Sequence, residues 1–503
     1  MRTRTLLYFV PILMIHSAAA QAPEFSEKAP IIKVEPSKGF PYKPTELHNY
    51  VLPPEEFKKR RAAFVEEIAK YGPGTIAIVK SAPVFPRNGD VEHEYRQDSD
   101  FYWLTGFHES ESMAIFDPDA ADAASDAKID TNNTKKRAVY SLMMLPRDPA
   151  RETWTGKRVG PERALSDFGV DAAFTNDQSD KLLKDAVARA KTLVIINNFD
   201  KDFSRKIDTL LNETRARTGE SPRIVNAGKW IGEQRLIKSP AEIEIMKRAI
   251  EVTIEGHFAA MRAARPGMNE GEVEAACEFV FRALGGPRLG YPSIAGGGNN
   301  GCVLHYNTNN EWLGPNSLML LDAGTEIGYY TSDITRTWPV NGKFTPEQRA
   351  IYNIVLRAQN AGIDKCRPGV VFSEVNDAAV REVTKGLIEV GILEGDLEEL
   401  IKKGAHRKVF MHGTSHWLGL DVHDSGSTKG RKFEPGMILT VEPGIYIAEG
   451  TPNIDKKWWG IGVRIEDDIL ITENGPLNLS ERLPRDVETI EKIVQEAHAR
   501  TEK

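Results

Sequence analysis

A repeated order of helix signals in the second half of the sequence constrains its fold more than any other feature. Residues 239–242 (SPAE) combine an N-cap serine, a proline in the first turn and a capping-box glutamate, and residues 345–348 (TPEQ) repeat the pattern. Each helix predicted from these signals ends at an Arg-Pro-Gly triplet, and a second amphipathic helix follows, over 269–284 and 373–390. The opening prolines are 106 residues apart and the closing prolines 102 apart. Generic capping signals are the alternative explanation, but the near-equal spacing favours an internal repeat.

The first predicted helix pair is followed by two strand-like runs that carry aspartates. Residues 318–338 (LMLLDAGTEIGYYTSDITRTW) contain Asp322 and Asp333, and a polar, glycine-containing turn separates the two runs. A hairpin is the simplest fold for this stretch, and it would place the two carboxylates side by side. Neighbouring carboxylates repel one another unless they share a proton or bind a cation. The hairpin is therefore a candidate metal site, and two aspartates in solvated turns are the alternative.

The repeat predicts a second acidic hairpin after the second helix pair. Residues 437–443 (MILTVEP) form an apolar run that closes on Glu442, and residues 462–472 (GVRIEDDILIT) form an alternating run that carries Glu466. Two such halves, facing each other across a pseudo-twofold axis, would bring four carboxylates to one centre. A pair of divalent cations held by bridging carboxylates would neutralise that charge.

Length and charge limit the classes of protein to which the chain can belong. The 503 residues are 41% hydrophobic and 27% charged, an ordinary globular composition in a chain too long for one compact core, so we expect two domains. The net charge of −7 offers no basic surface of the kind that nucleic-acid binding needs. No apolar run of the mature chain reaches the length needed for stable membrane insertion.

The first 47 residues differ from the rest. Residues 1–20 place two arginines before an apolar run and end in three alanines, which is the pattern of a secretory signal peptide and predicts export to the periplasm or the medium. A mitochondrial transit peptide is the alternative, but it would be richer in arginine and serine. Residues 21–47 hold five prolines and little apolar periodicity, so we expect an extended linker or arm.

Strand and helix patterns alternate between the linker and the repeat. This alternation indicates an N-terminal α/β domain over residues 48–222. The repeat occupies residues 223–490 as a second domain of α+β type, and residues 491–503 are expected to form a helical tail. The elements expected in the first domain are helices over 54–71 and 179–190 and strands over 75–79, 139–145 and 192–197.

A histidine-rich segment lies between the two acidic hairpins. Residues 410–424 (FMHGTSHWLGLDVHD) contain His412, His416 and His423. The four-residue step from His412 to His416 suits a zinc-binding helix, but the residues between them disfavour a helix and no glutamate follows His412. We therefore expect loop and strand here, with a nitrogen ligand available to the acidic centre.

Five motifs of the second domain stand in a characteristic order. They are LLDAG, SDITRTWPVNGKFT, MHGTSHWLGLDVHD, EPGMILTVEPGIY and GIGVRIEDDILIT. Together they resemble the motifs of the Xaa-Pro aminopeptidases (aminopeptidase P), which belong to the "pita-bread" metallopeptidases, and EYRQDSDFYWLTGF and RETWTGKRVG extend the resemblance into the first domain. The resemblance implies an N-terminal α/β domain followed by a pseudo-twofold pita-bread catalytic domain.

The resemblance also implies a metal centre and a reaction. The family's five ligand positions fall on Asp322, Asp333, His416, Glu442 and Glu466, with Asp333 and Glu466 as the bridging carboxylates. The implied cofactor is two divalent metal ions, usually Mn²⁺, with Zn²⁺ or Co²⁺ also suited to these ligands. The implied reaction is hydrolysis, by a metal-bridging hydroxide, of the bond between an N-terminal residue and a penultimate proline.

Catalytic roles follow from the same resemblance. Glu442 is the expected general acid and base. The family's histidines that lie beside the metal ligands, bind substrate and stabilise the tetrahedral oxyanion fall on His305, His412 and His423. Arg464 lies two residues before Glu466 on the same strand face, where it is expected to orient Asp333 or another acid.

Substrate-site positions of the family fall on Tyr446 and Trp154. In relatives, the residue equivalent to Trp154 reaches a neighbouring subunit's site, and we expect a homo-oligomer, either a dimer or a tetramer. The segment LHYNTNNEW (304–312) departs from the LHYTENE typical of the bacterial enzymes, which bears on the local loop and on substrate fit. Ser332 and Trp338 stand where glycine and phenylalanine are usual, but neither is a ligand position.

Two alternative functions remain open from the sequence. A prolidase would use the same five ligands but would cleave only dipeptides that end in proline. A metal-free binding module is the second alternative, because some pita-bread relatives have lost their ligands. This chain keeps all five ligand residues and has no acidic tail, which favours the enzyme.

Overall fold

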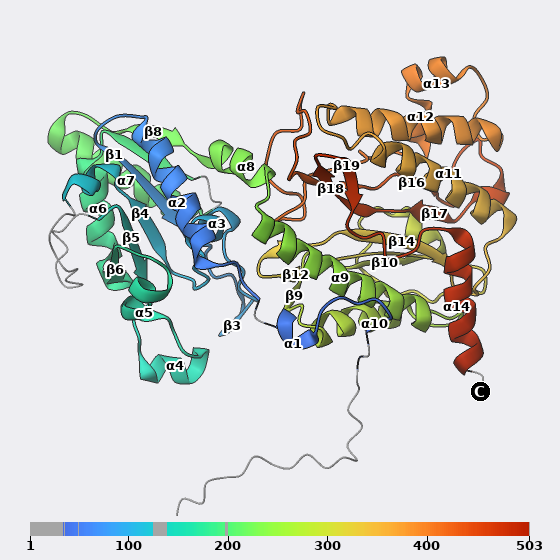
Figure 1. The fold of residues 1–503 in the computed structure, drawn as a ribbon, viewed down its shortest axis with the longest axis horizontal. Coiled ribbons are helices and arrows are strands. Elements are labelled where there is room, and N and C mark those ends of the chain that lie inside the picture. The colour runs from blue at the N-terminus through green and yellow to red at the C-terminus, as the bar shows by residue number, and fades with distance from the viewer. Residues whose placement is uncertain (1–33, 35, 49, 124–137, 197–199, 502–503) are drawn as a thin grey trace, which may run out of the picture. The chain divides into compact units, whose positions relative to one another are not determined.

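The structure is a computed structural model that describes residues 34, 36–48, 50–123, 138–196 and 200–501 (Figure 1). The predicted signal peptide and most of the predicted linker lie outside these residues. In the part of the chain that is described, no helix is both long enough and apolar enough to cross a bilayer.

The N-terminal domain is built on a six-stranded mixed sheet with the strand order β6-β5-β4-β1-β7-β8. Its two outer pairs, β5–β6 and β7–β8, are parallel, as is β1–β7, whereas β4 runs antiparallel to both of its neighbours. The strands are β1 (Thr75–Lys80), β4 (Met113–Phe116), β5 (Tyr140–Met144), β6 (Ala172–Thr175), β7 (Thr192–Ile195) and β8 (Arg223–Asn226).

Helices cover both faces of this sheet (Figure 1). On one face, Ile76 and Ile78 of β1 join a buried core with residues of α6 and α7. On the other face, Phe64 of α2 packs edge-on against Phe116 of β4. Alternate side chains along the strands thus pack against helices on opposite faces of the sheet, as expected for an α/β domain. The helices are α2 (Pro54–Ala69), α3 (Ser99–Thr105), α4 (Pro149–Thr155), α5 (Gly160–Asp167), α6 (Ser179–Arg189) and α7 (Lys201–Thr218).

Strand β8 extends the first sheet beyond the boundary predicted at residue 222. It pairs in parallel with β7, with Thr192 opposite Arg223 and Ile195 opposite Asn226. Its side chains are half-buried or exposed, so it lacks the apolar run that marks the inner strands. Helix α8 (Gly228–Leu236) follows and leads into the second domain.

The second domain contains the two predicted helix pairs. The first pair is α9 (Pro240–Ala263) and α10 (Glu270–Ala283), and the second pair is α11 (Pro346–Ile363) and α12 (Ser373–Glu389). The N-caps of α9 and α11 have almost the same backbone angles, φ −65° and ψ 162° at Ser239 against φ −66° and ψ 163° at Thr345, and both close a capping box. In Figure 1 the two pairs lie on either side of the strands that they enclose.

Two equivalent strand pairs lie between the helix pairs. Strand β11 (Leu318–Ala323) pairs antiparallel with β14 (Ile334–Pro339), and β15 (Ile438–Val441) pairs antiparallel with β18 (Asp467–Thr472). Asp322 lies in β11 and Asp333 directly precedes β14, whereas Glu442 directly follows β15 and Glu466 directly precedes β18. The remaining strands of this domain are β9 (Arg288–Leu289), β10 (Ile294–Gly297), β12 (Thr325–Ile327), β13 (Tyr330–Thr331), β16 (Gly444–Ile447), β17 (Ile461–Arg464) and β19 (Gly475–Asn478).

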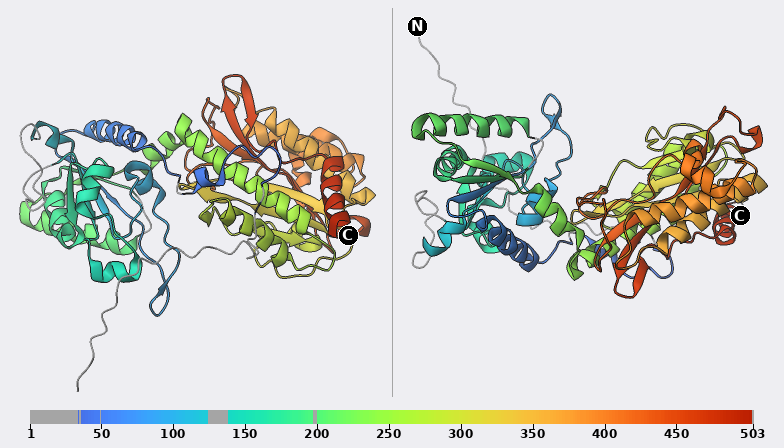
Figure 2. Two further views of the ribbon diagram at one scale, coloured as in Figure 1. Left: turned by 60° about the horizontal axis from the view of Figure 1, so that its bottom comes forward. Right: turned by 90° about the horizontal axis from the view of Figure 1, so that it is seen from above.

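The two ends of the described chain pack on helix α9. Within the segment predicted as a linker, Ser37 donates hydrogen bonds from its amide and its hydroxyl to Glu255, and the short helix α1 (Pro44–Leu47) ends in the buried Leu47. At the other end, helix α14 (Val487–Thr501) lies beside α9 (Figure 2). A hydrogen bond joins His498 to the carbonyl of Ala264.

Candidate metal centre and active site

The five predicted ligand residues line one cavity of about 530 Å³. Four other predicted site residues also line this cavity: three histidines and Arg464. The tyrosine and the titratable residues of the lining are Tyr291, His305, Asp322, Asp333, His412, His416, His423, Glu442, Arg464 and Glu466.

The first acidic hairpin places its aspartates side by side, as predicted. Both are buried, and the hydroxyl of Tyr291 lies 2.5 Å from Asp322 Oδ1 and 2.5 Å from Asp333 Oδ1. The second carboxylate oxygen of Asp322 accepts a hydrogen bond of 2.7 Å from Arg464. Asp333 Oδ2 lies 3.3 Å from His416 Nε2.

The second hairpin brings its two glutamates to the same place. Glu466 is 1% exposed, and its Oε2 accepts a 2.6 Å hydrogen bond from the hydroxyl of Thr335, while its amide donates to the carbonyl of Thr335. Because Thr335 belongs to β14, these two bonds join the halves of the repeat directly. Glu442 Oε1 lies 3.5 Å from His416 Nε2, so this imidazole faces one carboxylate from each half.

Charge repulsion is strong at this centre. Burial raises the pKa of Glu442 to about 7, and the charges of Asp333 and Asp322 act in the same direction. Burial also raises the pKa of Asp333 and of Glu466, and neighbouring carboxylates add to both effects. Burial lowers the pKa of His416, but the bond to Asp333 and the charge of Glu442 outweigh it and raise that pKa to about 9.

These residues fit a centre for hard or borderline divalent cations. Ligand atoms of Asp333, His416 and Glu466 lie within 4.8 Å of one another, and four carboxylates with one imidazole form the donor set. His416 Nδ1 lies 3.0 Å from the carbonyl of Trp417, which leaves Nε2 directed at the carboxylates. Cations at this point would remove the repulsion that buried carboxylates otherwise suffer.

Arg464, Tyr446 and His412 form a hydrogen-bonded chain beside the carboxylates. Arg464 is 3% exposed and donates to the hydroxyl of Tyr446 over 3.0 Å as well as to Asp322. The Tyr446 hydroxyl also lies 2.8 Å from His412 Nε2, and His412 Nδ1 lies 2.8 Å from the carbonyl of Gly413. Burial lowers the pKa of His412 to about 4, and the charge of Arg464 adds to this effect. Tyr446 is not itself a lining residue of the cavity, but its hydroxyl contacts two side chains that are, those of His412 and Arg464.

In the described part of the chain, His305 and His423 line the cavity without the ring hydrogen bonds that hold His412. Within the described residues neither ring accepts or donates a hydrogen bond inside the chain. The ring of His423 lies 4.2 Å from the ring of His416, and burial together with the His416 charge lowers the pKa of His423. Both histidines are therefore available to a ligand in the cavity.

Trp154 does not join the other predicted site residues. It lies on α4 of the N-terminal domain, is 86% exposed, and is not among the residues that line the cavity. The histidine segment 410–424 also differs from its expectation in part, because it is loop throughout and makes only an isolated bridge between Trp417 and Leu439.

Sequence reasoning missed Tyr291 and Thr335. Tyr291 precedes β10 in a glycine- and proline-containing turn with no acidic or histidine neighbour to mark it. Thr335 follows Asp333 by two residues in a strand where threonine is common. Only the tertiary contacts identify the two hydroxyls as partners of the carboxylates.

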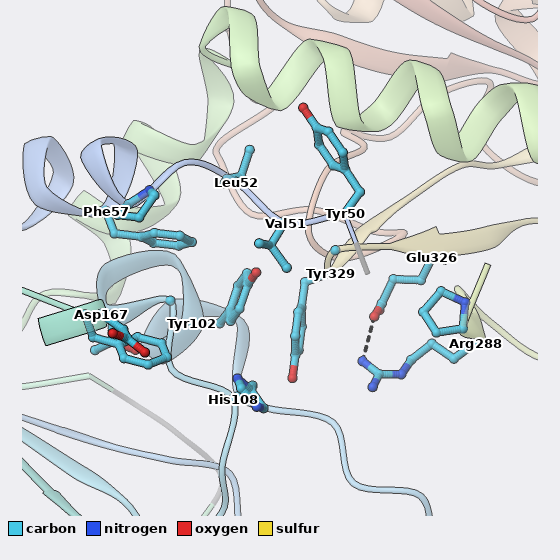
Figure 3. A pocket seen from close by; sticks show the side chains of 16 residues that line it. Tyr50, Val51, Leu52, Phe57, Tyr102, His108, Asp167, Arg288, Glu326 and Tyr329 are labelled. Atoms are coloured by element: carbon cyan, nitrogen blue, oxygen red, sulfur yellow. Dashed lines mark hydrogen bonds and ion pairs between the residues drawn. The ribbon is translucent and has the colours of Figure 1, made fainter. Parts of the chain in front are cut away.

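A second cavity of about 430 Å³ lies away from these residues (Figure 3). Five of its 16 lining residues are Phe or Tyr, and two of these, Tyr102 and Tyr329, have rings that stack at 3.8 Å. Glu326 in its lining is buried and paired with Arg288 over 2.8 Å and with Arg96 over 2.7 Å. None of the predicted site residues lies in this cavity.

Comparison with known proteins agrees with the site. Residues 244–473 match the metallopeptidase family M24, and residues 57–196 match the aminopeptidase P N-terminal domain. The chain is 40% identical to the Xaa-Pro aminopeptidase of Escherichia coli K12 over 454 residues, which is 88% of this chain and 97% of the relative. It is 33% identical to human Xaa-Pro aminopeptidase 3 over 451 residues, which is 88% of this chain and 86% of the relative.

Solved structures of these enzymes share the fold. Pseudomonas aeruginosa aminopeptidase PepP superposes with a TM-score of 0.83 at 40% identity, covering 89% of this chain and 99% of that one. Aminopeptidase P from E. coli with the inhibitor Pro-Leu superposes with a TM-score of 0.82 at 38% identity, covering 90% of this chain and 100% of that one.

A pita-bread domain with a converging set of carboxylates and one histidine, preceded by this α/β domain, defines a class of metal-dependent peptidase, and the chain belongs to metallopeptidase family M24. Within that family it groups with the Xaa-Pro aminopeptidases, and it is a metal-dependent aminopeptidase, a hydrolase. The predicted family, fold class and enzyme class are thus confirmed.

Proposed function

We propose that the enzyme hydrolyses the peptide bond between any N-terminal residue and a penultimate proline, acting on peptides rather than on nucleic acid. The observation that carries this proposal is the convergence of Asp333, His416 and Glu466, with ligand atoms within 4.8 Å of one another, in a cavity that two unpartnered histidines also line. The names of the relatives and the Pro-Leu inhibitor of the E. coli enzyme support the proline specificity.

The five ligand residues would hold two divalent ions, for which Mn²⁺ suits the oxygen-rich donor set best. Asp333 and Glu466 would be the central ligands, because Asp333 contacts His416 and Glu466 contacts Thr335 of the other half of the repeat. Two bound ions would neutralise the carboxylates, polarise the scissile carbonyl and supply an activated water near neutral pH.

The chain's own residues then orient the substrate and move the proton. Glu442, at the edge of the cavity beside His416, takes the proton of the attacking water and delivers it to the leaving proline nitrogen. His305 and His423 donate hydrogen bonds to the substrate carbonyl as it becomes an oxyanion. His412 stays fixed by Gly413 and Tyr446 and keeps the wall next to Glu442 in place.

A peptide panel tests this function against the prolidase alternative. We expect the purified chain, supplied with Mn²⁺, to release arginine from Arg-Pro-Pro and to turn over the dipeptide Gly-Pro at least about 100-fold more slowly, a difference of about 3 kcal/mol in transition-state binding. Turnover of the dipeptide alone would make the chain a prolidase. A chain that binds no divalent metal and stays inactive after metal addition would favour the binding-module alternative.

We also propose that the protein is exported and forms a homo-oligomer. The arginines, apolar run and alanines of residues 1–20 support export, and the 86% exposure of Trp154 supports a subunit contact on α4. N-terminal sequencing of the mature protein should begin at Gln21, and light scattering should give a mass of two or four chains. A mature chain that retains residues 1–20, or a monomer that is fully active, would contradict these proposals.

A further inference from the structure

One buried carboxylate outside the metal centre gathers hydrogen bonds from the whole loop that carries His305. Glu270 is the first residue of α10 and is 1% exposed. Its Oε1 accepts from the amide of Gly297 over 2.7 Å and from the side-chain amide of Asn300 over 2.9 Å. Its Oε2 accepts from the hydroxyl of Tyr306 over 2.9 Å and from the amide of Glu311 over 2.9 Å.

These four donors surround His305 in the sequence. Gly297 and Asn300 precede it, and Tyr306 and Glu311 follow it, so a single carboxylate closes the loop from both sides. The backbone amide of Glu270 also donates to the carbonyl of Glu311 over 2.9 Å. His305, in the middle of the loop, lines the cavity that holds the ligand carboxylates.

Glu270 acts as a hydrogen-bond acceptor in all four side-chain contacts. No cation among the described residues pairs with it, and every contact above is made with a neutral donor. Glu270 also lies in the first turn of α10, where the helix dipole favours an acidic side chain. Because both oxygens of this buried carboxylate accept hydrogen bonds from one loop, they fix the position of that loop.

We propose that Glu270 is a positioning residue for His305: its carboxylate holds the loop of residues 297–311 so that the His305 ring meets the substrate oxyanion in the cavity. This inference rests on the proposed function of His305. It adds a residue on a helix outside the metal centre and explains how a loop of unusual sequence, NTNNEW after His305, still presents its histidine. Among the described residues, Glu270 makes no hydrogen bond or ion pair to a predicted ligand residue, and it does not line the cavity.

The test compares Glu270→Gln with Glu272→Gln. Both residues lie in the first turn of α10, but Glu272 is exposed and bonds only to the N-cap residue Asn269. In Glu270→Gln a side-chain amide replaces one acceptor oxygen and faces a backbone donor, so the loop is released on one side. We expect kcat on Arg-Pro-Pro to fall by at least about 10-fold with KM within about 2-fold, and Glu272→Gln to behave as the wild type.

A double-mutant cycle separates positioning from general destabilisation. In a His305→Ala background, Glu270→Gln should change kcat by less than about 2-fold, because the residue through which it acts is gone. Bound metal should equal that of the wild type. An equal fall of kcat in both backgrounds, loss of metal, or no effect in the single variant would overturn the proposal. If Glu270→Gln does not fold, Tyr306→Phe removes one of the four bonds and enters the same cycle with the same expectation.

Hydrogen exchange distinguishes failure of this inference from failure of the proposed function. The amides of Gly297 and Glu311 should exchange at least about 10-fold faster in Glu270→Gln than in the wild type, whether or not any peptide is cleaved. A wild type inactive on all Xaa-Pro peptides would overturn the proposed function and with it the catalytic purpose of the loop. Unchanged exchange would overturn the loop contact itself.

Discussion

At the scale of single residues, the centre depends on side chains that the carboxylates contact rather than on the ligands alone. Tyr291 and Arg464 reach Asp322 from two sides, and Thr335 holds Glu466. Partners of this kind orient a ligand and commonly change metal affinity by about 10- to 100-fold when removed.

Replacing Tyr291 with phenylalanine should therefore weaken metal binding by about 10- to 100-fold. The variant loses the hydroxyl that lies 2.5 Å from both Asp322 and Asp333, and the two carboxylates lose their shared orientation. Calorimetric titration of the metal-free protein with Mn²⁺ measures the effect, and activity should recover at saturating metal. Tyr42→Phe, remote from the cavity, is the control. Unchanged affinity in Tyr291→Phe would show that the hydroxyl contributes nothing to the centre.

His257 should make the fold sensitive to mild acid. It is fully buried, and burial followed by the charge of Arg336 lowers its pKa to about 4. In the unfolded chain the histidine has its ordinary pKa of about 6.5. The contribution of neutral His257 to the free energy of unfolding is therefore complete above about pH 6.5. It falls by about 3 kcal/mol as the pH decreases towards 4. His257→Gln should reduce the drop in unfolding free energy between pH 7 and pH 4 by that amount, measured by denaturant titration. The same drop in His257→Gln as in the wild type would exclude this role, and the exposed His93→Gln controls for the loss of a histidine.

At the scale of elements, the sequence predicts where the helices of the repeat begin, but it does not predict where a strand such as β8 lies in a sheet. The caps at Ser239 and Thr345 act through neighbouring residues, so sequence spacing is sufficient to locate them. The predicted helices of the second domain accordingly begin within a residue of α9, α10, α11 and α12. The sequence prediction ended the first domain at residue 222 and so placed the residues of β8 in the second domain. The sequence does not mark β8 as part of the first sheet, because pairing with β7, and not its own half-exposed side chains, sets its place there.

Removing either cap should lower stability by a similar amount. Ser239→Ala and Thr345→Ala each delete a side-chain acceptor of the N3 amide, and each should reduce the unfolding free energy by about 1 kcal/mol. Helix α12 begins without a side-chain cap, so Ser373→Ala is the matched control and should change stability by less than about 0.5 kcal/mol. Denaturant unfolding of the three variants measures this. A large loss at only one of the two caps would argue against equivalent roles for the two helices.

At the scale of the whole molecule, the two halves of the repeat are joined by the charged centre that they share. Glu466 of the second half bonds to Thr335 of the first, and His416 faces Asp333 and Glu442. Binding of cations should therefore stabilise the second domain as one unit, because ions at this place bind only the folded chain.

Metal removal should lower the melting temperature accordingly. A free metal concentration 100-fold above the dissociation constant contributes about 2.7 kcal/mol, so the melting temperature should rise with added Mn²⁺ and fall when a chelator is present. Asp333→Asn removes a central ligand, and its melting temperature should be nearly independent of metal while its activity is lost. Scanning calorimetry with and without chelator measures both proteins. Normal metal content and turnover in Asp333→Asn would contradict the assignment of the centre.

The sequence by itself determined the repeat, the acidic hairpins and the histidine segment and, through motif resemblance, predicted the five ligand residues, because each depends on local spacing or on residue identity. The tertiary structure alone decided the rest. It brought Tyr291 and Thr335 to the carboxylates, left Trp154 exposed, and closed the His305 loop on Glu270, 35 positions earlier in the chain. The physical reason is that a buried carboxylate must find donors wherever the packed chain places them, and no local pattern records contacts between elements far apart in sequence.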